Sequence, residues 1–386
     1  LLESVSEARG VPLPPVRLST WEALRRMIRE QRGTRPSRPR LSAAHSEVSV
    51  VRVAPRDIAR PVPTLVGCAG SVEGQTPGGA AASAADRMLL DLVGRHPFLA
   101  VGDLASLLGW RPATALRRLA WLRARGLLRV LDQSEVGRLR TFGAPAAAVL
   151  VELTPAGLRL VAAQQGLTLG AAARFNGLVG GGPLAQGGVR LQRARRLLLR
   201  HLAHTRGADG FFLCMHAAGR ARDSLRRSGV AGVGGGADGT TRDGLVVWRN
   251  AVACARGHVR PDGYGVWARG DARHGFFLEY DRGTERGPAY RRKLGAYYDY
   301  RDSGRAARDY DGFPTILLVT PDTDVERRVA QVARAAAVGR TPELPLLLTC
   351  EWRFRGDVQR GAHLEGLLGP IWRTPESATR RCWPEP

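Results

Sequence analysis

Apolar residues first recur at regular spacing between residues 86 and 165. Three short segments have the spacing of amphipathic helices, which predicts a helix from Asp86, a second over 102–108 and a third over 113–125. Gly126 follows the third segment, as is common where helices end. The first regular unit of the chain therefore begins with three short helices.

The pattern changes to strands after this helical stretch. Residues 127–131 have the apolar character of a strand, and a polar turn and the stretch 138–142 complete a predicted hairpin. A further strand is predicted at 150–153, followed by a helix over 154–166. This order of helices and strands resembles a winged helix-turn-helix domain, and we assign residues 86–170 to it.

The second half of the chain alternates apolar strands with helices. A glycine-rich segment at 177–188 separates it from the first unit. The pattern then predicts an α/β fold with a mixed sheet flanked by helices. The predicted elements, in order, are a helix over 190–204, strands over 210–215, over 245–248, near 252–255, through 266–267 and over 276–281, a helix over 288–300, a strand over 315–320, a helix over 324–338 and a strand over 344–349.

The remaining segments have weaker patterns. Residues 1–85 are rich in proline and arginine and are expected to form a disordered or poorly ordered basic lead-in. The α/β unit is assigned to residues 189–350, and residues 351–386 are assigned to a C-terminal tail.

The charge of the chain favours a polyanionic partner. Its 386 residues carry 57 arginines and a single lysine against 35 acidic residues, which gives a formal net charge of +23. GC-rich codons would explain arginine in place of lysine, but not the excess of arginine over acidic residues. A surplus of this size attracts nucleic acid, and double-stranded DNA is the expected partner.

Other features of the composition limit the class of protein. The five cysteines are widely spaced and include no CxxC pair, so neither a zinc site nor a disulfide framework is indicated. No run of about 18 apolar residues and no signal peptide is visible. A cytoplasmic protein without a membrane partner is therefore expected.

The third helix of the predicted winged unit carries the candidate DNA contacts. In winged helix-turn-helix proteins this helix enters the major groove with its N-terminal residues, and the wing contacts the DNA backbone. The alternative is that these residues form a solvated face or a protein contact. The candidates are Arg111, Thr114, Arg117 and Arg118 on the helix and Arg138 and Arg140 on the wing.

Candidate catalytic acids lie on two strands of the second unit. Glu279 and Asp281 are two residues apart on a strand and therefore point to the same side of the sheet. Two acids beside an apolar stretch are costly to bury unless they bind a cation or a base. Asp262 lies at the start of a preceding strand and is expected to converge on them. Three carboxylates at a strand end suit Mg²⁺, which would activate water for attack on a phosphodiester.

Two histidines on the predicted helix over 190–204 are interpreted as surface residues. His201 and His204 lie one turn apart, which is a spacing that a metal pair would use. The sequence offers no third ligand nearby, so a metal site is not favoured there.

The acids and the order of elements resemble the PD-(D/E)xK nuclease core. In that core a helix, three strands, a helix and a strand carry acids on the second and third strands, as do Pro261-Asp262 and Glu279-Tyr280-Asp281 here. The family's lysine stands two residues after the second acid, where this chain has Asp281. Lys293, the only lysine, lies on the following helix, and some members of the superfamily look similar in this respect. The resemblance implies that Lys293 holds a phosphate or polarises the attacking water.

The combined order resembles the replication-relaxation family. The winged unit with "LTPAG" precedes "RPDG", "FFLEYDRGTE" and the helix "KLGAYYDY", over about residues 86–350. Members of this family are plasmid and mobile-element proteins of bacteria, implicated in plasmid replication and DNA relaxation. The resemblance implies a catalytic site of Asp262, Glu279, Asp281 and Lys293, with Mg²⁺ on Asp262, Glu279 and Asp281 and with Glu285 and Tyr297 as further candidates around it.

Three functions remain open from the sequence. The first is a DNA-binding protein with a Mg²⁺-dependent nicking or cleaving domain. The second is a DNA-binding scaffold whose nuclease fold is inactive and which serves other replication or mobilisation proteins. The third is a winged-helix transcription regulator whose second unit senses a ligand. The missing lysine after Glu279 favours the second, whereas three acids kept close together favour the first.

Overall fold

A computed structural model describes residues 82–131, 149–176, 199, 201–227, 243–355 and 365–384 of the chain. Several sequence predictions lie outside these residues. They are the lead-in up to residue 81, the predicted hairpin partner at 138–142 with Arg138 and Arg140, the glycine-rich segment at 177–188 and most of the predicted helix over 190–204.

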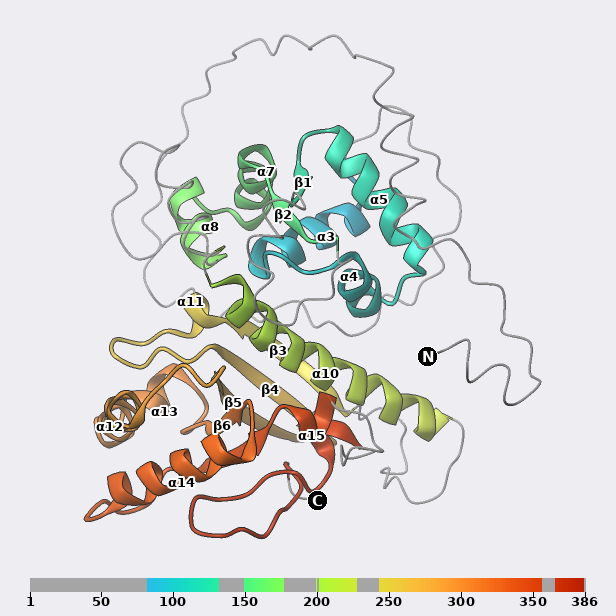
Figure 1. Ribbon diagram of the computed structural model, residues 1–386. Coiled ribbons are helices and arrows are strands. Elements are labelled where there is room, and N and C mark those ends of the chain that lie inside the picture. Colours follow the sequence, from blue (N-terminus) through green and yellow to red (C-terminus); the bar gives the residue numbers. More distant parts are fainter. Residues whose placement is uncertain are drawn as a thin grey trace, which may run out of the picture. The chain divides into compact units, whose positions relative to one another are not determined.

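The first described unit contains helices and two short strands (Figure 1). Its elements are α3 (Ala84–Arg95), α4 (Val101–Leu108), α5 (Pro112–Ala124), β1 (Leu128–Val130), β2 (Val151–Leu153), α7 (Pro155–Gln165) and α8 (Leu169–Phe175). Helix α3 begins after Ser83, whose hydroxyl accepts a hydrogen bond from the Asp86 N–H while Asp86 accepts one from the Ser83 N–H. Helix α7 is capped by Thr154 in a similar way. Local sequence therefore fixes where these helices begin.

The predicted helices of this unit are confirmed, and their apolar sides form a shared core. Leu89, Leu104 and Leu122, from three different helices, are fully buried in it. Strand β1 pairs in antiparallel fashion with β2, with Leu128 opposite Leu153. The stretch 138–142, which the sequence pattern pairs with this strand, lies outside the described residues.

A five-stranded mixed sheet forms the centre of the second unit, so the predicted α/β class is confirmed. The strand order is β3-β4-β5-β6-β7, in which β3, β4 and β5 are antiparallel and β5, β6 and β7 are parallel. The elements of this unit are α10 (Leu202–Arg227), β3 (Gly244–Asn250), α11 (Ala251–Cys254), β4 (Gly263–Arg269), β5 (Ala272–Tyr280), α12 (Gly287–Asp302), α13 (Arg305–Asp309), β6 (Thr315–Thr320), α14 (Thr323–Ala337), β7 (Leu346–Cys350), α15 (Trp352–Arg355) and the short helix η4 (Gly366–Leu368).

Helices cover both faces of the sheet (Figure 1). Phe276 and Leu278 of β5 pack on the face covered by α10, whereas Phe277 packs on the face covered by α12 and α14. Side chains alternate along a strand, so Glu279 points to the same face as Phe277. The strand therefore directs this acid towards α12.

Two predicted strands are helical in the structure. The apolar stretch 210–215 lies inside α10, where Phe211, Phe212 and Met215 are buried. A short apolar run has the same appearance in a buried helix and in a buried strand, so its pattern alone does not distinguish them. The stretch near 252–255 forms α11, because the Asn250 side chain caps its first N–H groups.

Helix α10 lies unusually close to the sheet at two glycines. A Cβ atom at Gly207 would lie 2.1 Å from the Tyr280 ring, and one at Gly263 would lie 2.5 Å from the Phe212 ring. Both distances are impossible for a larger residue without movement of the neighbour. The glycines thus allow α10, which carries His204, to approach the strand ends.

Residues 365–384, which the sequence pattern assigned to a C-terminal tail, pack against the sheet. Trp372 is fully buried, and the Leu348 and Arg373 backbones bond to each other beside β7. Arg380 bonds to the buried Glu326 of α14 at 2.9 Å. The aromatic residues of this segment explain the difference, since they add apolar area to the core.

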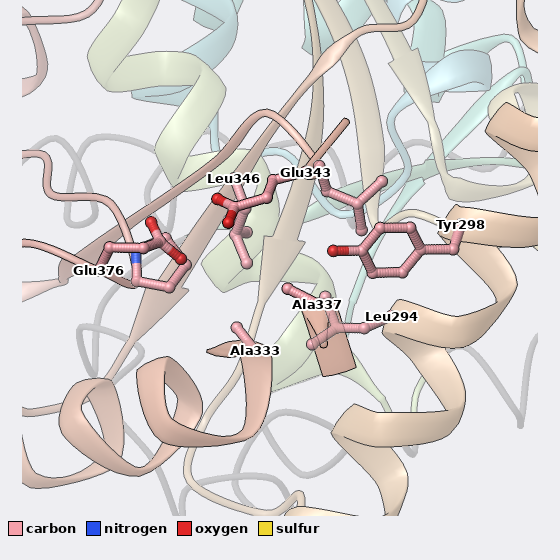
Figure 2. Close-up of a pocket in the computed structure, with 9 residues that line it drawn as sticks. Leu294, Tyr298, Ala333, Ala337, Glu343, Leu346 and Glu376 are labelled. Atoms are coloured by element: carbon pink, nitrogen blue, oxygen red, sulfur yellow. The ribbon is translucent and has the colours of Figure 1, made fainter. Parts of the chain in front are cut away.

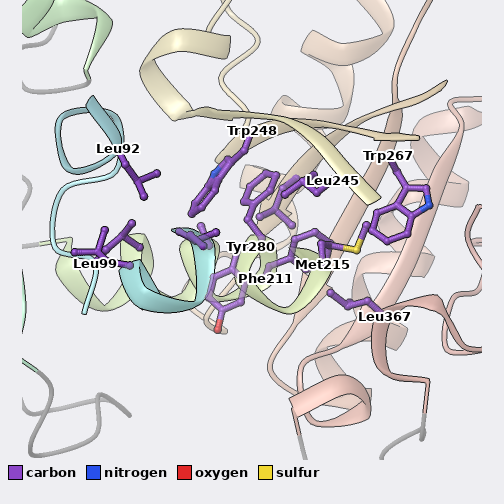
Figure 3. Packing of buried hydrophobic residues seen from close by; sticks show 14 of the residues in the cluster. Leu92, Leu99, Phe211, Met215, Leu245, Trp248, Trp267, Tyr280 and Leu367 are labelled. Atoms are coloured by element: carbon purple, nitrogen blue, oxygen red, sulfur yellow. The ribbon is translucent and has the colours of Figure 1, made fainter. Parts of the chain in front are cut away.

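Side chains of α10 and β3 contact the first unit. Arg206 pairs with Asp103 at 2.8 Å, and the Asn250 amide donates to the Arg95 carbonyl at 2.7 Å. One cluster of buried residues includes members of both units, and Figure 3 shows Leu92 of the first unit and Trp248 of β3 within it.

Candidate functional site

The strand ends that carry Asp262 and Glu279 lie side by side. Asp262 directly precedes β4, and its backbone N–H donates to the Leu278 carbonyl at 2.8 Å. Gly263 is paired with Leu278 in the antiparallel ladder, so one further step of this register sets Asp262 opposite Glu279. The two acids are therefore neighbours at one end of the sheet.

Two donors hold the Asp262 carboxylate. Its Oδ2 accepts from the Tyr280 N–H at 2.8 Å, and its Oδ1 lies 2.8 Å from His204 Nε2. Both side chains reach solvent, with 19% of Asp262 and 34% of His204 exposed. Burial lowers the pKa of His204, but the hydrogen bond and the charge of Asp262 outweigh burial and raise that pKa overall. The contact with Asp262 therefore stabilises the protonated form of His204.

The Glu279 carboxylate lies deeper and is only 2% exposed. Its Oε2 accepts from Lys293 Nζ at 2.8 Å, and its Oε1 accepts from the Tyr297 hydroxyl. Burial raises the pKa of Glu279, the Lys293 ammonium opposes this rise, and the charge of Asp262 adds to it. Burial also disfavours the charged form of Lys293, but Glu279 and Asp262 raise its pKa overall. Lys293 is thus held as an ammonium ion beside two acids.

Helix α12 directs three polar side chains towards β5. Tyr290, Lys293 and Tyr297 are three and four residues apart, so they project from one face of the helix. Tyr290 reaches Asp281, and the other two reach Glu279. This spacing explains how a lysine on the helix reaches an acid on the strand.

Asp281 has different partners from Asp262 and Glu279. Its Oδ2 accepts from the Tyr290 hydroxyl, and its Oδ1 accepts from the N–H groups of Thr284 and Glu285 at 3.2 and 3.4 Å. Asp281 is buried, with 7% exposed. Both of its oxygens are therefore engaged by α12 and the loop before it. Glu285 instead reaches Lys293, since its Oε1 lies 2.8 Å from Lys293 Nζ. We call the group formed by Asp262, Glu279, Glu285, His204 and Lys293 the acid cluster.

Whether these acids suit a metal ion depends on how they are grouped. Among the described residues, no three His, Cys, Asp or Glu side chains converge closely enough to hold one. Asp262 and Glu279 nevertheless offer hard oxygen donors, and Mg²⁺ is commonly held by one or two carboxylates together with water and a substrate phosphate. In the same part of the structure, Glu285 Oε2 is shielded from solvent without a hydrogen-bond partner. Asp262 and Glu279 are thus of the donor type that Mg²⁺ takes, and all four of their oxygens accept hydrogen bonds within the chain.

The candidate DNA contacts on α5 differ in their surroundings. Arg111 and Arg117 are exposed, and Thr114 is half-buried. The Arg118 guanidinium pairs with Asp86 at 2.9 Å and lies over the Trp110 ring, 5.4 Å from its centre. Arg118 therefore holds α5 against its own unit, and the outward charge of the helix comes from the other arginines.

The sequence pattern missed one member of the acid cluster. His204 lies 58 positions before Asp262 in the chain, and only the packing of α10 on the sheet brings them together. The glycine that permits this packing, Gly207, is three residues away on the same helix. A glycine one turn from a polar residue was the available signal, although it is a weak one.

A small pocket is lined by residues of α12, α14 and β7 (Figure 2). Leu294 and Tyr298 of α12, Ala333 and Ala337 of α14, and Leu346 of β7 contribute to its lining. Its space suits about one water molecule. No predicted site residue lines it, so we do not assign it a ligand.

These features define a class of protein with two units. A smaller helical unit with an exposed basic helix comes first in the chain, and an α/β unit follows, with the acid cluster at the end of its mixed sheet. The model of the replication-relaxation family matches residues 90–316, and the chain belongs to this family. No curated protein and no solved structure was found to match the chain. Within the described ranges, no helix combines the length and the apolar character needed to cross a membrane.

Proposed function

We propose that this chain is a DNA-binding protein of plasmid or mobile-element replication, and that it nicks or cleaves DNA with an active site formed by Asp262, Glu279 and Lys293. The observation that carries the proposal is the ion pair between Glu279 and the only lysine of the chain, beside Asp262. Family membership supports the role in replication.

The order of elements supports a nuclease fold. Helix α10, the antiparallel strands β3 to β5, helix α12 and the parallel strand β6 follow one another as in the PD-(D/E)xK core. Asp262 directly precedes the second strand and Glu279 lies on the third, close to where that core carries its acids. Lys293 takes the place of the strand lysine from α12, with its ammonium 2.8 Å from Glu279.

Each residue of the cluster has a distinct part in hydrolysis of a phosphodiester. Lys293 binds a phosphate oxygen and stabilises the charge that develops on it. His204, partly exposed beside Asp262, is the candidate for carrying a proton to or from the reacting oxygen. Glu279 holds Lys293 in place. An Mg²⁺ ion held by Asp262 and Glu279 would supply a Lewis acid for the phosphate.

The first unit supports DNA binding of the winged helix-turn-helix type. Helices α3, α4 and α5 are followed by the paired strands β1 and β2, which is the order expected of that fold. The exposed side chains of Arg111 and Arg117 leave α5 with outward positive charge, which suits the phosphates and base edges of a major groove.

A second candidate is a scaffold that binds DNA without cleaving it. The observation that favours it is that the oxygens of Asp262 and Glu279 all have donors within the chain, including His204 and the Lys293 ammonium. Because donors of the chain already stabilise both carboxylates, this site has less need of a metal ion.

Electrophoretic mobility shifts test the DNA-binding part of the proposal. Arg117→Gln is expected to weaken binding about tenfold, by loss of one contact worth about 1–3 kcal/mol, and to reduce the salt dependence if the contact is to phosphate. Arg123→Gln is the matched control, because Arg123 is also exposed but lies about 120° around α5. Equal effects of the two variants, or affinity that does not change with salt, would contradict DNA binding through this face of α5.

A further inference from the structure

Asp281 connects three parts of the structure that surround Lys293. It directly follows β5, and its backbone N–H still bonds to Val319 of β6 at 2.9 Å. Its carboxylate accepts hydrogen bonds from Thr284 and Glu285 in the loop and from Tyr290 in α12. Asp281 therefore ties the sheet to the loop and to the helix.

The loop held by Asp281 turns back towards the acid cluster. Gly283 adopts a left-handed backbone conformation (φ 77°), which a residue with a side chain rarely adopts. Two residues later, Glu285 Oε1 lies 2.8 Å from Lys293 Nζ. The carboxylate of Asp281 and the turn at Gly283 thus set the direction of Glu285.

Lys293 is held from two sides. Its Nζ donates to Glu279 Oε2 of the strand and to Glu285 Oε1 of the loop, each at 2.8 Å. Charge-assisted hydrogen bonds of this length are strong and directional. The position of the ammonium therefore depends on a strand acid and on a loop acid together.

We propose that Asp281 is a positioning residue for Lys293, and that it does not bind substrate or a cation itself. It orders residues 282–286 so that Glu285 and Glu279 share the ammonium. This inference rests on the proposed function for its catalytic meaning, because Lys293 is the group that would contact the phosphate. Whether Asp281 orders the loop and so positions Lys293 does not depend on the protein having any activity.

The proposal separates two uses of the Asp281 side chain. A ligand for a cation needs the negative charge, whereas the loop needs only an oxygen that accepts from backbone N–H groups. Asp281→Asn keeps that oxygen, and the Tyr290 hydroxyl can turn to accept from the new amide. Asp281→Ala removes both functions. The asparagine variant should therefore behave like the wild type, and the alanine variant should not.

The single lysine makes its environment directly measurable in the full chain. Incorporation of lysine labelled with ¹⁵N at Nζ leaves the ammonium unmodified and should give one side-chain signal in a ¹H–¹⁵N spectrum, because Lys293 is the only lysine. Asp281→Asn should keep the wild-type chemical shift and the wild-type exchange rate of the ammonium protons. Asp281→Ala should move the signal towards that of a solvated lysine and raise the exchange rate roughly tenfold, since one of two strong hydrogen bonds is lost.

Glu285→Gln provides a second test if the alanine variant fails to fold. It leaves Asp281 intact, removes the loop charge from Lys293 and should move the signal in the same direction. An Asp281→Asn signal displaced as far as that of Glu285→Gln would overturn the proposal, as would an unchanged signal in a folded Asp281→Ala. Nicking of plasmid DNA is scored separately, so an inactive wild type would reject the proposed function while the lysine signal still decides the role of Asp281.

Discussion

Removal of the Lys293 ammonium is the perturbation with the clearest expected result. Lys293→Met keeps the length of the side chain and removes one of the two donors to Glu279. The carboxylate stays buried beside Asp262 with only the Tyr297 hydroxyl as a donor. A buried charge that loses its partner is strongly destabilising, because its desolvation is no longer offset.

The magnitude follows from the burial of the two groups. Breaking a fully buried ion pair costs about 3–5 kcal/mol. Lys293 is 28% exposed, so water can approach the vacated position and the lower value of about 2–3 kcal/mol is expected. At roughly 2–4 °C per kcal/mol, Tm should fall by roughly 4–12 °C.

Thermal unfolding of four proteins at two pH values measures this effect. Lys293→Met should lose stability at pH 8, and Lys293→Met/Glu279→Gln should recover most of it, because no buried charge remains. Loss of the ammonium raises the pKa of Glu279 further, so the carboxyl takes up a proton as the pH falls. The deficit of Lys293→Met should therefore shrink at pH 5. Arg292→Met, an exposed neighbour on α12, should have little effect.

Two results would refute this reasoning. If the double variant is as unstable as Lys293→Met, the loss comes from packing of the lysine stem and not from the stranded carboxylate. If the deficit of the single variant is the same at pH 5 and pH 8, protonation of Glu279 does not relieve it.

Two further predictions concern the helix that carries His204. Burial raises the pKa of Asp209 to about 7, with Arg206 opposing the rise, and the folded state therefore carries a buried charge above that pH. Asp209→Asn should stabilise the protein by up to about 4 kcal/mol at pH 8, progressively less between pH 7 and pH 4, and not at all below about pH 4. An equal gain at pH 4 and pH 8 would contradict a charge effect. Gly207→Ala should lower Tm and displace α10 from Tyr280, whereas Gly295→Ala on α12, where a Cβ meets open space, should be neutral or stabilising. Unfolding scans of the two alanine variants decide this, and equal Tm values would contradict the close approach at Gly207.

The sequence was sufficient for those parts of the site that depend on local order. Glu279 alternates with apolar neighbours on β5, and Asp262 follows a proline at a strand start, so both strand ends were recognisable. Lys293 stood out because it is the only lysine, and the helical spacing with Tyr297 indicated a shared face. The mixed sheet followed from the alternation of strands and helices.

The parts that could not be predicted depend on long-range packing or on loop geometry. His204 meets Asp262 only because α10 crosses the sheet at Gly207, and the helical nature of 210–215 was hidden by a uniformly apolar run. Two acids on the same side of a strand appear equivalent in the sequence. The structure distinguishes them, because Glu279 pairs with Lys293 while Asp281 is held by Tyr290 and the loop.

The central proposal is that the protein cleaves DNA with a site formed by Asp262, Glu279 and Lys293. Incubation of supercoiled plasmid with the protein and Mg²⁺ tests this proposal most directly. Nicked circles should form with the wild type and Arg292→Met, disappear with Glu279→Gln and Asp262→Asn, and depend on Mg²⁺ in the buffer. If supercoiled plasmid stays intact with the wild type while a mobility shift shows that it is bound, the cleavage claim is contradicted and the non-cleaving scaffold is the better account.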